Sequence, residues 1–178
     1  VRVKTDILRR SSIGTIFTGR STSQAHTGSN EAYGVDATLA FFDNLSINAM
    51  WARTRTDGFN GDETSYRAQL DYNADRYGVQ LEHLVVGDAF NPEVGFVPRV
   101  GIRRSKLHLE GNPRPGKWGI RMLEPMWNVV VHTDQTGRLV SRRYHNMLGT
   151  QFDSGAVLNI VYNRVFERLD RPFQVASG

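Results

Sequence analysis

The chain of 178 residues contains no cysteine, and only three of its 22 basic residues are lysines. Without cysteine, a disulfide scaffold, a thiolate zinc site, an iron–sulfur cluster and a cysteine nucleophile are all excluded. No apolar run approaches the ~18–20 consecutive residues that a membrane-spanning helix needs, so a helical membrane protein is excluded as well. The 22 basic residues exceed the 18 acidic ones by four and form no basic tail. We therefore expect no nucleic-acid partner.

Motifs for catalysis and cofactor binding are missing too. There is no Gly-x-Ser-x-Gly elbow, His-Glu-x-x-His pair, P-loop or dinucleotide fingerprint. The five histidines are scattered, and His108 and Glu110, which share one face of an extended run, have no evident third metal ligand. The acidic run 57–63 lacks the spacing of an EF-hand. The sequence therefore predicts no metal, no cofactor and no identifiable catalytic residue.

Period-two alternation of apolar and polar residues recurs along the whole chain. Residues 33–41 and 45–52 alternate on either side of a turn at Asp43-Asn44, and residues 66–72 and 77–85 do so around a turn at 73–75. Both pairs predict antiparallel hairpins. The further extended runs are Arg2–Leu8, 12–20, 100–109, 117–133, 139–148 and 156–164. In total we expect nine or ten antiparallel strands, with Pro125 bending or interrupting the run 117–133.

The connections predict the architecture. Paired strands are joined by turns of two or three residues, whereas the longer segments 21–31, 55–65 and 87–99 separate the hairpins. This asymmetry favours an all-β, up-and-down (meander) antiparallel β-barrel of the outer-membrane type. The chain begins without Met and ends just after a strand-like run. We therefore expect one domain, residues 1–178, that is a piece of a longer protein.

Alternation alone does not say which face of the barrel is apolar. A membrane barrel turns its apolar face outward, and a soluble barrel turns it inward. Tyr33 and Phe41 lie eight steps apart, which spans roughly 20 Å in a strand tilted by about 40° and matches the distance between aromatic girdles. The membrane orientation is favoured. Arg103-Arg104 and Arg142-Arg143 place an arginine on both faces, so those segments should extend beyond the bilayer.

Several stretches resemble a known family. They are residues 75–83 and 86–96, Ser12-Ile13-Gly14 with Thr18-Gly19-Arg20, Tyr33-Gly34-Val35-Asp36, and Glu167-Arg168-Leu169 with Arg171-Pro172-Phe173. Together they resemble the C-terminal β-rich domain, of unknown function, of bacterial envelope proteins that carry an N-terminal family-9-type carbohydrate-binding module. The resemblance covers nearly the whole chain. It implies a β-barrel in the outer membrane of Gram-negative bacteria, with carbohydrate binding residing in the other module. Chains of this family continue past the Pro-Phe motif with further strands, so the resemblance also implies that residues 1–178 are an incomplete fragment of a larger barrel.

These observations predict an outer-membrane β-barrel domain that serves as an anchor, with uptake or surface binding of carbohydrate as a further role. Membrane lipid or lipopolysaccharide is the expected partner, and carbohydrate a second one. The candidate ligand-binding residues, in the lumen or the long loop, are Asp36, Arg67, Asp71, Glu82, Glu93 and Arg99. Glu93 and Arg99 are expected to pair and order that loop. The alternative is a soluble barrel or sandwich that binds glycans. A glycoside hydrolase, which needs two carboxylates about 5–10 Å apart, is a remote third.

Overall fold

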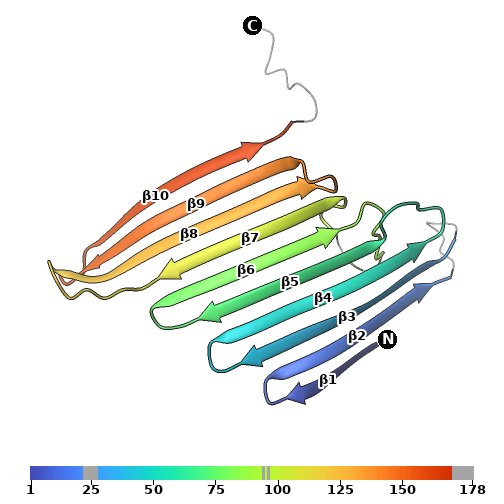
Figure 1. Cartoon of the computed structure of the whole chain (residues 1–178), viewed down its shortest axis with the longest axis horizontal. Coiled ribbons are helices and arrows are strands. Elements are labelled where there is room, and N and C mark those ends of the chain that lie inside the picture. Colours follow the sequence, from blue (N-terminus) through green and yellow to red (C-terminus); the bar gives the residue numbers. More distant parts are fainter. Residues whose placement is uncertain (22–27, 94, 96, 170–178) are drawn as a thin grey trace, which may run out of the picture.

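The alternating runs form one antiparallel sheet in a computed structural model that describes residues 1–21, 28–93, 95 and 97–169 (Figure 1). Each strand pairs with the strands before and after it in sequence, so the sheet order is β1 to β10 without a crossover. The strands are β1 (Arg2–Leu8), β2 (Ser11–Arg20), β3 (Asn30–Phe41), β4 (Leu45–Thr56), β5 (Thr64–Asn73), β6 (Tyr77–Val86), β7 (Ile102–Gly111), β8 (Ile120–Asp134), β9 (Leu139–Phe152) and β10 (Val157–Glu167). The predicted all-β antiparallel meander is confirmed.

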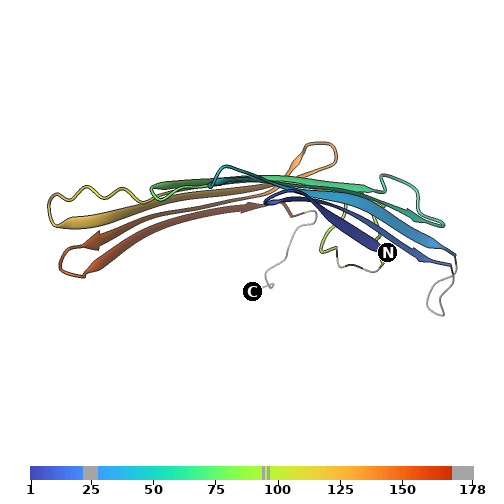
Figure 2. The ribbon, with the colours of Figure 1, turned by 90° about the horizontal axis from the view of Figure 1, so that it is seen from below.

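The sheet is open. Within the described residues, β1 pairs only with β2 and β10 only with β9. Figure 2 shows a curved single layer, with the segment that follows β6 lying beneath its concave side. The described residues contain no helix, and so none that is long and apolar enough to cross a membrane.

Two details differ from the expectations. Pro125 does not interrupt β8, because it sits in the ladder opposite Leu148. The pairing of β8 with β7 stops at Met126, so Pro125, which has no N–H, has a neighbouring strand on one side only. The predicted contrast between short turns within hairpins and long segments between them also has exceptions. Residues 112–119 form a long segment at the end of the sheet that carries the short turns 42–44 and 74–76, whereas the opposite end includes the short connection 135–138.

We call these two ends the turn end, with connections 42–44 and 74–76, and the loop end, with connections 57–63, 87–101 and 135–138. The strand register assigns every strand residue to one of two faces, because paired residues lie on the same side of a sheet. The apolar face carries, on the central strands, Val35, Ala37, Leu39, Ile47, Ala49, Ala68, Leu70, Val79, Leu81, Leu107, Leu109, Val129 and Val131.

The polar face carries the residues between them. Its central members are Asp36, Thr38, Asn48, Arg67, Gln69, Asp71, Gln80, Glu82, Arg104 and Lys106. The segregation predicted for the two hairpins therefore extends across the neighbouring strands. Only Val85, Val86, Ala89, Phe90 and Ile102 are buried apolar residues in the described chain. All five lie at the loop end, in or beside the connection 87–101, so the rest of the sheet has no buried hydrophobic core.

Candidate functional site

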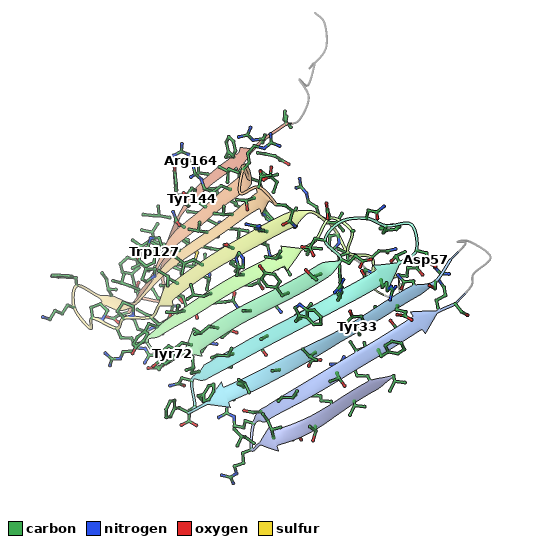
Figure 3. The ribbon with its side chains drawn as sticks, turned by 45° about the vertical axis from the view of Figure 1, so that its right-hand side comes forward. Tyr33, Asp57, Tyr72, Trp127, Tyr144 and Arg164 are labelled. Atoms are coloured by element: carbon green, nitrogen blue, oxygen red, sulfur yellow. The ribbon has the colours of Figure 1, made fainter. Side chains whose placement is uncertain are left out.

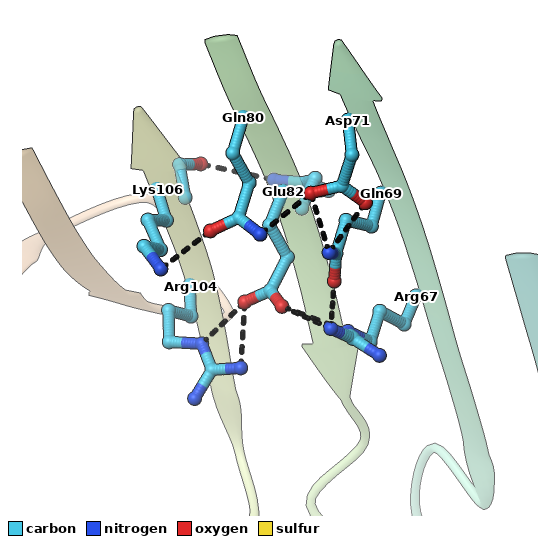
Figure 4. A network of polar contacts seen from close by, with 9 residues as sticks. Arg67, Gln69, Asp71, Gln80, Glu82, Arg104 and Lys106 are labelled. Carbon is cyan, nitrogen blue, oxygen red and sulfur yellow. Dashed lines mark hydrogen bonds and ion pairs between the residues drawn. The ribbon is translucent and has the colours of Figure 1, made fainter. Parts of the chain in front are cut away.

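The centre of the polar face is a network of ionic hydrogen bonds around Glu82 (Figure 4). Glu82 on β6 is only 9% exposed, and its two carboxylate oxygens accept hydrogen bonds from different strands. Arg67 on β5 donates to Oε2, with its closest nitrogen at 2.6 Å, and Arg104 on β7 donates to Oε1, also at 2.6 Å. Burial of a carboxylate is costly unless it is paired and hydrogen-bonded, and the two guanidinium groups satisfy both conditions.

A second carboxylate, Asp71, extends this network toward the turn end. It accepts hydrogen bonds from Gln69 Nε2 at 2.7 Å and from Gln80 Nε2 at 2.6 Å, and Lys106 Nζ donates to Gln80 Oε1 at 2.5 Å. Gln69 also accepts a hydrogen bond from Arg67, which joins the two carboxylate centres. The structure therefore brings together three of the predicted residues, Arg67, Asp71 and Glu82.

Asp36 lies on the same face but outside the network. Its nearest cation is Arg2 on the edge strand β1, at 3.4 Å, and both side chains are partly exposed. No hydrogen bond joins Asp36 to Asp71 or Glu82. A glycosidase needs two free carboxylates at a defined separation, one of which acts as an acid. Here Glu82 and Asp71 are each held by several donors, which is the arrangement of a structural network.

The segment between β6 and β7 is fastened to the polar face at the loop end. Asn91 donates its backbone N–H to Thr54 Oγ1 at 3.0 Å, and the Asn91 carbonyl accepts a hydrogen bond from Asn30 Nδ2 at 2.9 Å. Thr54 has no exposed surface and Asn30 is only 3% exposed. These two residues of β4 and β3 therefore lie beneath the segment, which covers that part of the polar face.

Apolar contacts reinforce the attachment. Phe90 packs with Val86 and Ile102, and Ala52, Leu84 and Val97 surround this small cluster. The chain also turns tightly at Gly87, where a Cβ atom would lie 2.0 Å from the carbonyl oxygen of Asp62. Any side chain at position 87 would force the segment away from the neighbouring connection, so glycine is required there.

The predicted pair of Glu93 and Arg99 is wrong. Glu93 is bound instead by Arg20 at the end of β2, through Nε at 2.5 Å and a terminal nitrogen at 2.7 Å. Sequence reasoning missed this pair because 73 positions separate its members. Arg99 lies next to the polar face and forms no ion pair with a described residue.

Two carboxylates of the acidic connection 57–63 accept hydrogen bonds from residues outside it. Asp57 accepts hydrogen bonds from the backbone N–H and the hydroxyl of Ser29, and the backbone bond is the main reason that its pKa is lowered. Asp62 caps the start of β5 by accepting from the N–H and hydroxyl of Thr64. At the turn end, Asp75 accepts two hydrogen bonds from the guanidinium of Arg114, and these bonds lower its pKa.

Metal ligands do not converge in the part of the chain that the structure describes. His108 and Glu110 do share a face, as expected, and their side chains meet at 3.3 Å. No third ligand joins them among the described residues, so the pair is a surface contact. His26 and the motif Arg171-Pro172-Phe173 lie outside the described residues, as do Val94 and Phe96 of the long segment.

Two cationic members of the network, Arg104 and Lys106, were not among the predicted residues. Alternation in the run 100–109 is blurred by Arg103 and Ser105, which lie on the apolar face. The pairing of Glu82 with Lys106 and of Leu84 with Arg104 is what places these cations beside the carboxylates. This placement follows only when the register between β6 and β7 is known, and sequence alternation alone does not determine that register.

Comparison with protein-family models, with curated proteins and with solved structures gave no match for this chain.

Proposed function

We propose that this chain forms part of the wall of an outer-membrane β-barrel, with its apolar face against lipid and its polar face toward the lumen. The observation that carries the proposal is a single-layered sheet with one face covered by exposed apolar side chains. Leu81, at the centre of that face, is 46% exposed, and Val35 is 49% exposed. A soluble domain would bury such a face under a second layer. A contiguous apolar surface of this extent marks contact with a membrane or a partner.

The position of charge on the apolar face supports a lipid contact. The charged side chains that the regular strand register places on this face are Glu31, Arg53, Arg55, Arg103, Arg142 and Arg164. All six lie in the part of their strand nearer the loop end. From β2 to β8 the middle of the apolar face is left without charge, as a bilayer requires, because an arginine costs about 2–4 kcal/mol at midplane and little near the interface. On β9 and β10, Arg142 and Arg164 lie in the same register rows as Ser105 and Leu107.

Polar residues in the middle of the apolar face satisfy one another. His83 Nδ1 and Ser105 Oγ, on neighbouring strands, form a hydrogen bond of 2.9 Å, and the His83 ring packs beside Tyr66. In the same register row on β9, the Arg142 guanidinium lies 5.2 Å from the centre of the Tyr144 ring. Such pairing lowers the cost of polar groups in a medium without water.

Aromatic residues flank this band, which is uncharged from β2 to β8. Tyr33, Trp51 and Tyr66 lie toward the loop end, and Tyr72 and Trp127 lie toward the turn end on β5 and β8 (Figure 3). Two rows of aromatic side chains on either side of an apolar band are the girdles of a membrane barrel. The strands β2 to β7 have 10 or 12 residues, close to the length that crosses a bilayer at a tilt.

The role that follows is that of an anchor whose polar face borders an aqueous lumen. The segment 87–101, fastened over the polar face, narrows the lumen at the loop end and brings Arg99 to its surface. The resemblance to envelope proteins with a carbohydrate-binding module adds carbohydrate as a solute for uptake or surface binding. The alternative is a soluble glycan-binding domain whose apolar face is covered by another part of the protein.

Two adjacent valines at the centre of β8 offer a matched test. Val129 lies on the apolar face between Leu107 and Tyr144, whereas Val130 lies on the polar face between Lys106 and Arg143. Val129→Glu should sharply reduce the fraction of protein that stays in membranes after an alkaline carbonate wash. Val130→Glu, which adds the same charge beside two cations, should leave that fraction unchanged. Release of the unmodified protein by carbonate would overturn the proposal in favour of the soluble domain.

A further inference from the structure

A cluster of cationic side chains lines a pocket on the polar face beside the network of Glu82. The pocket has a volume of about 200 Å³, and its polar lining is Arg99, Arg104, His132 and Ser141. Its apolar wall comes from Leu84, Val86, Val97 and Ile102, which are largely shielded from water by the segment 87–101. The pocket is therefore a cavity with one cationic side and one apolar side.

The strand register explains why these groups meet. His132 on β8 is paired with Arg104 on β7 and with Ser141 on β9, so the three residues form a row across the polar face. Ser141 Oγ lies 3.0 Å from His132 Nδ1. Arg143 lies two residues further along β9 on the same face, and Arg104, Arg99 and Arg143 all act electrostatically on the His132 ring.

Positive charge is in excess around this pocket. Arg104 is paired with Glu82, but that carboxylate is already shared with Arg67. Arg99 and Arg143 are exposed, and their side chains form no hydrogen bond or ion pair with any described residue.

Two other carboxylates lie near this end of the polar face, and neither neutralises these arginines. Asp134 is held by Thr136 and Arg138 in the turn after β8. Glu167 lies opposite Ser141 on β10 but forms no ion pair with the arginines. Arg99 in the lining of the pocket, and Arg143 beside its His132, are thus left without a counter-charge among the described residues.

We propose that this pocket binds an oxyanion group (a carboxylate, phosphate or sulfate) carried by a solute on the lumenal side, with Arg99 and Arg143 as its principal donors. Guanidinium groups match the planar geometry of paired oxygens and bind them through charge-assisted hydrogen bonds. The Ser141 hydroxyl supplies a further donor. The apolar wall at Leu84, Val97 and Ile102 lowers the local dielectric and accommodates the uncharged part of the solute.

This inference rests on the proposed function in one respect only, which is that the polar face is open to water. Binding is therefore measured on the full chain in detergent micelles, where bilayer insertion plays no part. The probes are inorganic phosphate and, as a carboxylate on a sugar, glucuronate. Titration is followed by the NMR signals of the arginine Nε–H groups and by calorimetry.

We expect saturable binding of at least one probe, and shifts confined to Arg99, Arg104 and Arg143. Arg99→Gln and Arg143→Gln should each weaken binding at least fivefold. Neither change removes an existing ion pair, so both variants should fold. Arg9→Gln is the matched control, because Arg9 is an exposed arginine in the turn after β1 and should not affect binding.

The test has two outcomes that overturn the inference. One is an absence of saturable binding for both probes, and the other is an equal loss of binding in Arg9→Gln, which would indicate attraction to net charge alone. Preference for glucuronate over phosphate would identify an acidic sugar as the source of the oxyanion, and the reverse preference a phosphorylated solute. Failure of the carbonate test with intact probe binding would remove the membrane assignment and leave the anion site standing.

Discussion

At the scale of single residues, Glu82 stands out because it carries a charge and is only 9% exposed. It is a nearly buried carboxylate that links three strands through two arginines. Removal of one member of a fully buried ion pair costs about 3–5 kcal/mol, because the remaining charges lose their partner. Arg67 and Arg104 are more than one third exposed, so water can solvate part of each guanidinium group when the carboxylate is removed.

We therefore expect Glu82→Gln to reduce the free energy of unfolding by about 1–3 kcal/mol, less than the loss from a fully buried pair. The measurement is chemical unfolding of the folded protein in micelles, followed by its β-sheet circular dichroism. Asp75→Asn serves as control, since it removes a carboxylate that is paired with Arg114 but exposed at a turn. An unchanged midpoint for Glu82→Gln would show that the network contributes nothing to stability.

At the scale of elements, the segment 87–101 is attached to the sheet by hydrogen bonds, by an ion pair and by the apolar cluster around Phe90. The backbone N–H of Asn91 has Thr54 Oγ1 as its acceptor, in a position closed to water. Thr54→Val keeps the shape of the side chain and removes that acceptor. Loss of one such hydrogen bond costs about 1–1.5 kcal/mol, which corresponds to roughly tenfold faster exchange.

Hydrogen–deuterium exchange should therefore show faster exchange at Asn91 in Thr54→Val. The same substitution at Thr38, which bonds Asn48 on the polar face away from the segment, should leave Asn91 unaffected. Equal exchange at Asn91 in both variants would mean that the apolar cluster of Phe90, Val97 and Ile102 holds the segment without this hydrogen bond.

The strands were predictable because each depends on a local pattern. Alternation in 33–41 and 66–72, with short turns after each run, is enough to define the hairpins and to place Asp36, Arg67 and Asp71 on one face. The position of the long segment was not predictable in the same way. Glu93 pairs with Arg20, and Asn91 donates a hydrogen bond to Thr54. Each contact joins the long segment to another hairpin, so both depend on how separate hairpins are aligned. Alternation defines a face within one hairpin and carries no information on such distant pairs.

At the scale of the whole molecule, the three tryptophans report on where the two faces lie. Trp51 and Trp127 are on the apolar face toward opposite ends of the sheet, and both are substantially exposed. Trp118 lies in the connection 112–119 and is 87% exposed. If the apolar face contacts lipid, Trp51 and Trp127 lie at the two interfaces and Trp118 lies in water beyond the turn end.

Variants that retain one tryptophan, with phenylalanine at the other two positions, separate these signals in vesicles of brominated phospholipid. Trp51 and Trp127 should be quenched, and more strongly by bromine near the headgroup than by bromine near the chain ends. Trp118 should be quenched weakly. The Trp118 variant is the internal control, because it inserts with the same sheet but places its indole outside the apolar band. Equally weak quenching of all three would mean that protein, and not lipid, covers the apolar face. The sheet would then be one layer of a soluble domain, since an uncovered apolar surface of this size does not persist in water.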